Sequence, residues 1–325
     1  MISRKSARLF LALLGICAAV RAADAAAPLQ HVIVIVMENT NADPHGGAPF
    51  IYGNTNEAPY INGELIPRYA RAVNFRDALS LSVPSEPHYV LMEAGTNVFD
   101  DATFGDDALA DADPSALRST ASTAHLVSQM RATDGRVTWM SYQEGLSEKT
   151  GACPVKSSTA AHYGAKHDPF VFFQDVAGNP PSKTNEYCAA HHKPYSALAA
   201  DMAAARLANY VFITPNLCHD MHDKCGNQSR VRNGDDWLRA ELAAMIDFAD
   251  THDGVIFLAW DEGKETRTIP FLAIGKRAKK AFAGKALYDH GSIIKTVEKI
   301  FGLPVLEAVK GSRDLGELFV DGTMP

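Results

Sequence analysis

Four runs of apolar residues, rich in Val and Ile, are spaced along the chain. They cover residues 31–37, 209–215, 255–260 and 269–274. An unbroken apolar run of this length is typical of a strand that is covered on both faces, as in a parallel sheet. Helical patterns lie between the strands, most clearly over 235–249 and 293–301. The alternation predicts an α/β fold with a mostly parallel central sheet sandwiched by helices.

Weaker patterns complete this outline. They predict helices over 60–70 and 117–132 and short strands over 72–75 and 137–142. Residues 99–115 are acidic and small, which indicates an exposed loop. Residues 143–195 show no sustained period, so we predict a long, loop-rich insertion there, of the kind that is often functional in a compact domain.

Polar side chains follow three of the apolar runs at the point where each run ends. They are Glu38 and Asn39, then His219, Asp220 and His222, then Asp261 and Glu262. Open α/β sheets bind ligands beyond the carboxyl ends of their parallel strands, so we expect these side chains to meet at one edge. Carboxylate and amide oxygens suit a hard divalent cation. Unrelated polar loops are the alternative interpretation.

Ser85 stands on a stiff turn before a predicted helix. Pro84 and Pro87 flank it, and each proline fixes its own φ and pushes the preceding residue toward an extended conformation. The start of a helix has free N–H groups and the positive end of the dipole, which favour an anion. Ser85 is therefore either a nucleophile beside an anion site or an ordinary helix cap. His290 leads a later helix in the same way.

Together these segments resemble a known family. The matching motifs are Glu-Asn after the first strand, Pro-Ser-x-Pro-x-Tyr at 84–89, Pro-Asn-x-x-x-Asp-x-His at 215–222, Trp-Asp-Glu-Gly at 260–263 and His-x-Ser at 290–292. The pattern is similar to that of the bacterial phosphoesterase family, which holds acid phosphatases and non-haemolytic phospholipases C and belongs to the alkaline phosphatase superfamily. The resemblance covers about residues 31–320, and the spacings are similar to those of the acid phosphatase branch.

The resemblance implies an alkaline-phosphatase-like fold and a metal-dependent acid phosphatase that acts through a phosphoserine on Ser85. It implies one divalent metal ion held by Glu38, Asn39, Ser85, Asp261 and Glu262. Oxygen ligands favour Ca²⁺, Mg²⁺ or Mn²⁺. The residues that would contact the phosphate or the leaving group are His219, Asp220, His222 and His290.

The resemblance leaves the roles of two segments open, those that contain His88 and His167. The family commonly has an Asn three residues after the nucleophile as an oxyanion donor, and His88 occupies that place here. We therefore count His88 among the catalytic candidates, with an altered substrate or pH preference. His167, with the Asp-Pro-Phe that follows it, is similar to a family segment and would either shape the site or form a structural turn. His191 and His192 are expected at the surface.

Composition and charge bear on compartment and partners. The 325 residues are 46% hydrophobic, enough for one large core, and the net charge of −7 lacks the basic footprint of a nucleic-acid binder. Arg4, Lys5 and Arg8 precede an apolar run at 9–17 and small residues near 23–25, the pattern of a signal peptide. We therefore expect a signal peptide over 1–25, one catalytic domain over 26–325, export to the periplasm or beyond, and no stable membrane insertion.

Four cysteines follow the predicted signal peptide, an even number in a chain expected to be exported. This indicates two disulfides, with three possible pairings. The local pairs, Cys153–Cys188 and Cys218–Cys225, are the simplest. The sequence leaves the oligomeric state open.

Two rival functions remain beside a phosphatase acting on small phosphate esters. A phospholipase C-type phosphodiesterase would share the core site but would need a wider groove with an apolar mouth. A non-catalytic exported binding protein would keep the fold alone. A sulfatase is disfavoured, because the chain lacks the Cys-x-Pro-x-Arg stretch from which those enzymes make their modified nucleophile.

Overall fold

A computed structural model of the chain describes residues 28–107, 113–146 and 151–320. The predicted signal peptide, over residues 1–25, lies outside these ranges. Among the described residues, no helix combines the length and the apolar character needed to cross a membrane.

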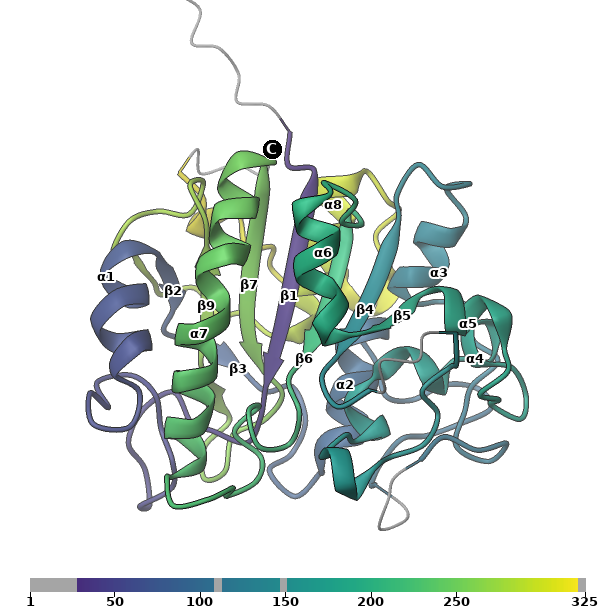
Figure 1. Ribbon diagram of the computed structural model, residues 1–325, viewed down its shortest axis with the longest axis horizontal. Helices are drawn as coiled ribbons and strands as arrows, with labels where there is room; N and C mark the ends of the chain where they lie inside the picture. The colour runs from purple at the N-terminus through teal and green to yellow at the C-terminus, as the bar shows by residue number, and fades with distance from the viewer. Residues whose placement is uncertain (1–27, 108–112, 147–150, 321–325) are drawn as a thin grey trace, which may run out of the picture.

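One eight-stranded sheet forms the centre of the molecule (Figure 1). Its strands, in spatial order, are β10 (Ala283–Gly284), β2 (Ala70–Ala72), β9 (Phe271–Ile274), β7 (Gly254–Trp260), β1 (His31–Met37), β6 (Tyr210–Thr214), β4 (Trp139–Gln143) and β5 (His192–Pro194). Five of its seven pairings are parallel, and the two made by β9 are antiparallel. A separate two-stranded sheet pairs β3 (Phe75–Arg76) with β8 (Thr268–Ile269). The predicted mostly parallel sheet is thereby confirmed.

Helices cover both faces of the sheet. Figure 1 shows α6 (Leu198–Ala203) and α7 (Arg230–Thr251) in front of the central strands and α8 (His290–Phe301) behind them. The helix that begins at Ser85, α2 (Ser85–Ala94), packs against α8. Since all seven residues of β7 are buried, the unbroken apolar runs of the sequence are explained by cover on both sides.

The remaining helices are short. They are α1 (Ile66–Arg68), α3 (Leu126–Arg131), α4 (Gln174–Ala177) and α5 (Glu186–Ala190). A π-helical turn spans Ile61–Leu65, and 3₁₀ turns span Thr159–Ala161, Ala165–His167, Pro169–Phe172, Tyr195–Ala197, Glu307–Val309 and Gly316–Leu318. Several of these lie in the predicted insertion over 143–195, which is irregular but well supplied with turns.

The structure corrects several local predictions. The helix predicted over 117–132 forms only over α3, because Thr120 binds Asp101 at 2.6 Å through its hydroxyl and also bridges to Phe173. Such side-chain and bridge contacts compete with helical hydrogen bonds. The strand predicted over 269–274 is divided at Pro270 into β8 and β9, since a proline cannot donate to the sheet.

Two disulfides join the four described cysteines. Cys153 pairs with Cys188 and Cys218 with Cys225, with Cα–Cα distances of 5.1 and 5.4 Å. The local pairing is therefore confirmed. The first bridge closes much of the irregular insertion, and the second closes the loop that follows β6.

Candidate active site

The ends of β1 and β7 bring four polar residues together. The two strands pair in parallel with Met37 opposite Trp260, so the residues that follow them leave the sheet side by side. The backbone N–H of Asn39 donates to Asp261 Oδ1 at 3.0 Å, and that of Glu262 donates to the same oxygen at 2.6 Å. Asn39 has a positive φ of 48°, which turns its chain sharply away from the strand. Glu38, Asn39, Asp261 and Glu262 thus form one cluster, as the strand ends predict.

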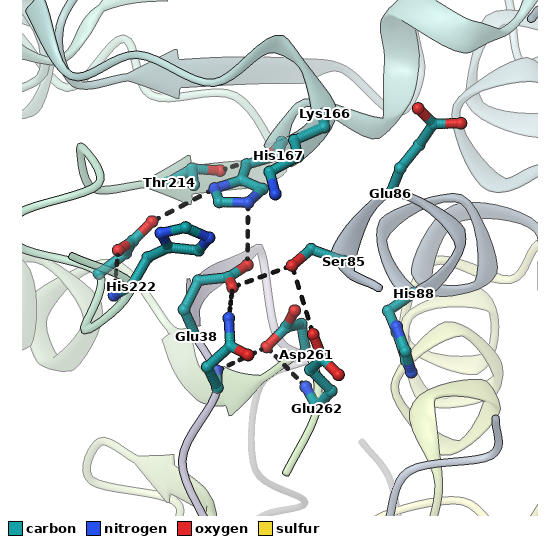
Figure 2. A network of polar contacts seen from close by, with 12 residues as sticks. Glu38, Ser85, Glu86, His88, Lys166, His167, Thr214, His222, Asp261 and Glu262 are labelled. Carbon is teal, nitrogen blue, oxygen red and sulfur yellow. Dashed lines mark hydrogen bonds and ion pairs between the residues drawn. The ribbon is translucent and has the colours of Figure 1, made fainter. Parts of the chain in front are cut away.

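Ser85 points into this cluster from the first residue of α2 (Figure 2). Its Oγ lies 3.2 Å from Glu38 Oε2 and 3.4 Å from Glu262 Oε1. Pro84 occupies the N-cap position in an extended conformation and has no side-chain acceptor to offer as a cap. The Ser85 hydroxyl therefore faces the carboxylates and is not used as a helix cap.

Burial and mutual repulsion shift the pKa values of the clustered carboxyl groups. Burial raises the pKa of Glu38, but the charges of His167, His222 and Lys166 outweigh it and hold this pKa at about 2. Burial, with repulsion from Glu38, raises the pKa of Glu262 to about 7. The same two causes raise the pKa of Asp261 well above its usual range. Three carboxyl groups at one point therefore share protons unless a cation joins them.

The donor set fits a hard cation. Glu38 Oε1, Asn39 Oδ1 and Asp261 Oδ2 are buried oxygens that accept no hydrogen bond within the described structure. The Asn39 amide donates to Glu38 through Nδ2, which leaves its oxygen available. Buried oxygens without donors are costly alone and are suited to metal ligation. One ring nitrogen of His88 also lies within 4.8 Å of oxygens of Asp261 and Glu262.

His167 joins the cluster from the irregular insertion. Its Nε2 lies 3.2 Å from Glu38 Oε1, and its Nδ1 lies 3.2 Å from Asp220 Oδ2. The ring of Tyr89, from α2, stacks on it at 4.8 Å. Burial lowers the pKa of His167 to about 3, although the Glu38 carboxylate opposes this shift. The structure thus places His167 at the site, in favour of the first of the two interpretations left open by the sequence.

The other candidate histidines take different places. His222 lies beside His167 in Figure 2, with one ring nitrogen within 4.8 Å of ligating atoms of Glu38 and His167. Its backbone N–H donates to Asp220 Oδ1 at 2.7 Å. His219 instead binds Glu144 at 2.9 Å, and its side chain is 39% exposed.

His88 and His290 lie behind the cluster, fully buried. The two ring nitrogens of His88 contact Pro84 O at 2.8 Å and Asp77 Oδ1 at 3.0 Å. Burial lowers the pKa of His88, but Asp77 outweighs this and the net shift is upward. His290 Nε2 lies 3.0 Å from Trp260 O, at the end of β7. Both rings therefore support the turns that carry Ser85 and Asp261.

Two cations at the site had not been singled out from the sequence. Lys166 Nζ lies 2.9 Å from Asp107 Oδ2. In the sequence, only its position next to His167 indicated that Lys166 lies at the site. Arg230 donates to Asn39 O at 3.1 Å and to His222 O at 3.4 Å. No local pattern marks Arg230, because its role depends on where the first turn of α7 meets the ends of β1 and β6.

Comparisons with known proteins agree with this geometry. The model of the Phosphoesterase family matches residues 58–266. The chain is 28% identical over 289 residues to phosphatidylinositol-3-phosphatase of Mycobacterium tuberculosis, covering 87% of this chain and 80% of that protein. It is 24% identical over 281 residues to a phosphate-repressible acid phosphatase of Penicillium chrysogenum, covering 83% of this chain but only 62% of the fungal protein.

Solved structures share the fold. A phosphonate monoester hydrolase from Silicibacter pomeroyi superposes with a TM-score of 0.54 at 11% identity, covering 91% of this chain and 77% of that one. A protein of the alkaline phosphatase superfamily from Vibrio parahaemolyticus gives a TM-score of 0.50 at 11% identity, covering 89% and 70% of the two chains. The resemblance drawn from the sequence motifs and the predicted fold class are both confirmed.

Proposed function

Because this chain belongs to the Phosphoesterase family and is a hydrolase acting on phosphoric ester bonds, we propose that it is a metal-dependent acid phosphatase that cleaves phosphate monoesters through a phosphoserine on Ser85. One observation carries the proposal. The Ser85 hydroxyl lies between Glu38 and Glu262, within 3.4 Å of each, at the start of a helix. A serine held in this way is oriented for attack at an anion site.

Four residues would hold one divalent cation: Glu38, Asn39, Asp261 and Glu262. A bound cation of this type lowers the pKa of an adjacent hydroxyl and offsets charge on phosphoryl oxygens. Ca²⁺, Mg²⁺ and Mn²⁺ suit such oxygen-rich ligands. The arrangement of His167 and Asp220 supports this assignment, since His167 contacts Glu38 and Asp220 contacts the other ring nitrogen of His167.

The remaining steps of the reaction would be carried out by side chains and backbone groups of the protein. Ser85 Oγ attacks phosphorus and displaces the alcohol, and water afterwards attacks the phosphoserine and releases phosphate. Backbone N–H groups in the first turn of α2 and the ammonium of Lys166 are in position to bind phosphoryl oxygens. We assign protonation of the leaving-group oxygen to His222, whose ring nitrogen lies within 4.8 Å of ligating atoms of Glu38 and His167. We keep His219 and His290 as weaker candidates for contact with the substrate.

Small phosphate monoesters are the proposed substrates, in line with the acid phosphatase and inositol-lipid phosphatase activities named for the relatives. The two disulfides favour an oxidising compartment, so we propose export to the periplasm or the exterior. The oxygen-rich centre is common to phosphomonoesterases and phospholipases C. Substrate preference therefore has to be measured.

The test compares p-nitrophenyl phosphate with bis-p-nitrophenyl phosphate across pH 4–9, with and without a chelator. We expect turnover of the monoester to exceed that of the diester, to vanish with chelator and to return with added cation. Mass spectrometry of protein quenched in acid should find phosphate on Ser85. Faster diester cleavage would favour the phospholipase C-type alternative, and binding without turnover of either ester would favour a non-catalytic protein.

A further inference from the structure

A carboxylate from a remote loop binds the first turn of the Ser85 helix. The backbone N–H of Glu86, the second residue of α2, donates to Asp107 Oδ1 at 3.0 Å. The other oxygen of the same carboxylate, Oδ2, accepts from Lys166 Nζ at 2.9 Å. Asp107 therefore bridges a helix N-terminal N–H and an ammonium group, one residue from the nucleophile.

These two donors are the groups that a phosphoryl oxygen would use. The N–H groups of the first turn have no partner within the helix and face an anion bound at its end. Lys166 also interacts electrostatically with Glu38 and Asp261, so its charge acts on the carboxylate cluster itself. Figure 2 shows Lys166 above Ser85, and the Glu86 side chain pointing away from the carboxylate cluster. A phosphate ester attacked by Ser85 would meet both donors.

Asp107 lies outside the buried core and is partly exposed. The Lys166 and Asp107 side chains are 17% and 24% exposed, so the carboxylate can turn toward water. The residues that it bridges are well separated from it in sequence, and Pro84 offers no cap of its own. Although Asp107 is remote in sequence, its carboxylate supplies the negative charge that this helix end attracts.

We propose that Asp107 is a resident competitor for the substrate phosphate: it occupies the anion position between Glu86 N–H and Lys166 Nζ, and an incoming phosphate displaces it. This inference rests on the proposed function of Ser85. It makes Asp107 a specificity-determining residue, because each bound anion must replace a hydrogen-bonded carboxylate. Weakly charged or poorly placed anions are excluded, and the product phosphate is released more readily.

The experiment measures binding of inorganic phosphate and of tungstate to the cation-loaded protein by isothermal titration calorimetry. Asp107→Asn keeps the size of the side chain and an acceptor for Glu86 N–H but removes the charge. We expect roughly tenfold tighter phosphate binding, the size of one hydrogen bond to a charged group. The KM for p-nitrophenyl phosphate should fall in parallel, and the inhibition constant of phosphate should fall with it.

Two further variants make the result decisive. Asp106→Asn is the matched control, since the Asp106 side chain is 72% exposed and pairs with Arg118; its phosphate affinity should stay unchanged. Lys166→Gln should weaken phosphate binding, because it removes the ammonium that the phosphate would gain. If Asp107→Asn is unstable, the variant Asp107→Ser is used in its place, because its hydroxyl is also an acceptor for Glu86 N–H.

Phosphate affinity that is unchanged or weaker in Asp107→Asn, with a lower unfolding temperature, would overturn the inference and leave Asp107 as a structural cap. Calorimetry needs no turnover, so the two hypotheses fail separately. If the wild type cleaves no ester while Asp107→Asn binds phosphate more tightly than the wild type, the proposed function is refuted and the anion competition is supported. If the wild type cleaves the ester while Asp107→Asn shows no gain in phosphate affinity, the proposed function is supported and the anion competition is refuted.

Discussion

The Ser85 hydroxyl lies 3.2 Å from Glu38 Oε2, although the two residues are 47 positions apart and belong to different elements. Glu38 directly follows β1 in the mostly parallel sheet, and Ser85 is the first residue of α2. The contact links the predicted nucleophile to the predicted cation site. It is the relationship on which the proposed chemistry depends, so the first predictions concern its two ends.

We predict that Ser85→Ala lowers kcat for p-nitrophenyl phosphate by at least about a thousandfold, because the attacking oxygen is lost. The change in the free energy of unfolding should stay within about 1 kcal/mol, since only one hydroxyl is removed. Ser82→Ala, on the exposed part of the same turn, is the control and should keep full activity. A folded Ser85→Ala protein with near wild-type turnover would remove Ser85 from the mechanism.

We predict that Asp261→Asn weakens cation binding and that excess cation restores part of its activity. The amide keeps an oxygen for the N–H groups of Asn39 and Glu262 but removes one charge from the cluster. Cation should also raise the free energy of unfolding of the wild-type protein, by about 2.7 kcal/mol at a concentration a hundredfold above Kd. Elemental analysis and activity titrated with Ca²⁺, Mg²⁺ and Mn²⁺ provide the measurement.

The control for this series is Asp247→Asn, an exposed carboxylate of α7, which should bind cation like wild type. Metal-free wild-type protein that keeps full activity would contradict the assignment. The remaining positive groups, Lys166 and the histidines, would then have to stabilise the phosphate alone.

The strand ends were predictable because parallel pairing forces them together. An apolar run followed directly by Glu38-Asn39 or Asp261-Glu262 predicts both the strand and the residue at which it ends, so the cluster follows from parallel topology. Ser85 was marked by its two prolines. These are local signals that act over a few residues, and the structure has them in the predicted arrangement.

The supporting residues were not predictable, because they reach the site through long loops. Lys166 and Asp107 are brought together across 59 positions, and Arg230 meets Asn39 across 191. His192, expected at the surface, is buried because its ring lies against Asp168 at 3.1 Å and contacts Cys188, which forms a disulfide. Such contacts depend on how the insertion folds back, and no short sequence period encodes that.

We predict that Arg230→Gln lowers activity and weakens cation affinity by several-fold. Its guanidinium holds the carbonyl of Asn39, whose left-handed backbone orients the amide ligand, and the carbonyl of His222. Loss of a charged donor to buried carbonyls costs roughly 1.5–3 kcal/mol. Arg232→Gln is the matched control, because it removes an ion pair with Asp236 and a hydrogen bond to Asn56 O, neither of which involves a residue of the cluster. Equal cation affinities in the two variants would show that Arg230 has no positioning role.

We predict that the two disulfides stabilise the protein unequally. In the chain-entropy model the stabilisation grows with the closed loop, and the sequence separations are 35 for Cys153–Cys188 and 7 for Cys218–Cys225. The model gives about 4 and about 2 kcal/mol respectively. Urea unfolding of the two double Cys→Ser variants measures the difference.

Free-thiol titration of denatured, unreduced wild type should find almost no thiol, and four reactive thiols would contradict both bridges.

The last prediction concerns a buried triad at the far end of the Ser85 helix. His125 Nδ1 lies 2.9 Å from Glu93 Oε1, near the C-terminal end of α2, and His125 Nε2 lies 2.9 Å from Asp175 Oδ1. Phe173 stacks on the ring at 3.9 Å. Two carboxylates on opposite nitrogens favour the doubly protonated ring. Although burial lowers it, these contacts raise the pKa of His125 from 6.5 to about 9.

A folded-state pKa above the unfolded value stabilises the protein fully below pH 6.5, and this stabilisation is lost as pH rises toward about 9. A shift of this size corresponds to about 3 kcal/mol. Burial also raises the pKa of Glu93, and this shift likewise makes stability fall as pH rises. His125→Gln should therefore be less stable at pH 6 and should lose less stability between pH 6 and 9 than wild type. Urea unfolding at pH 6, 7.5 and 9 measures both, with His252→Gln, at an exposed position, as control. Parallel pH profiles for wild type and His125→Gln would show that the ring is neutral in the folded protein.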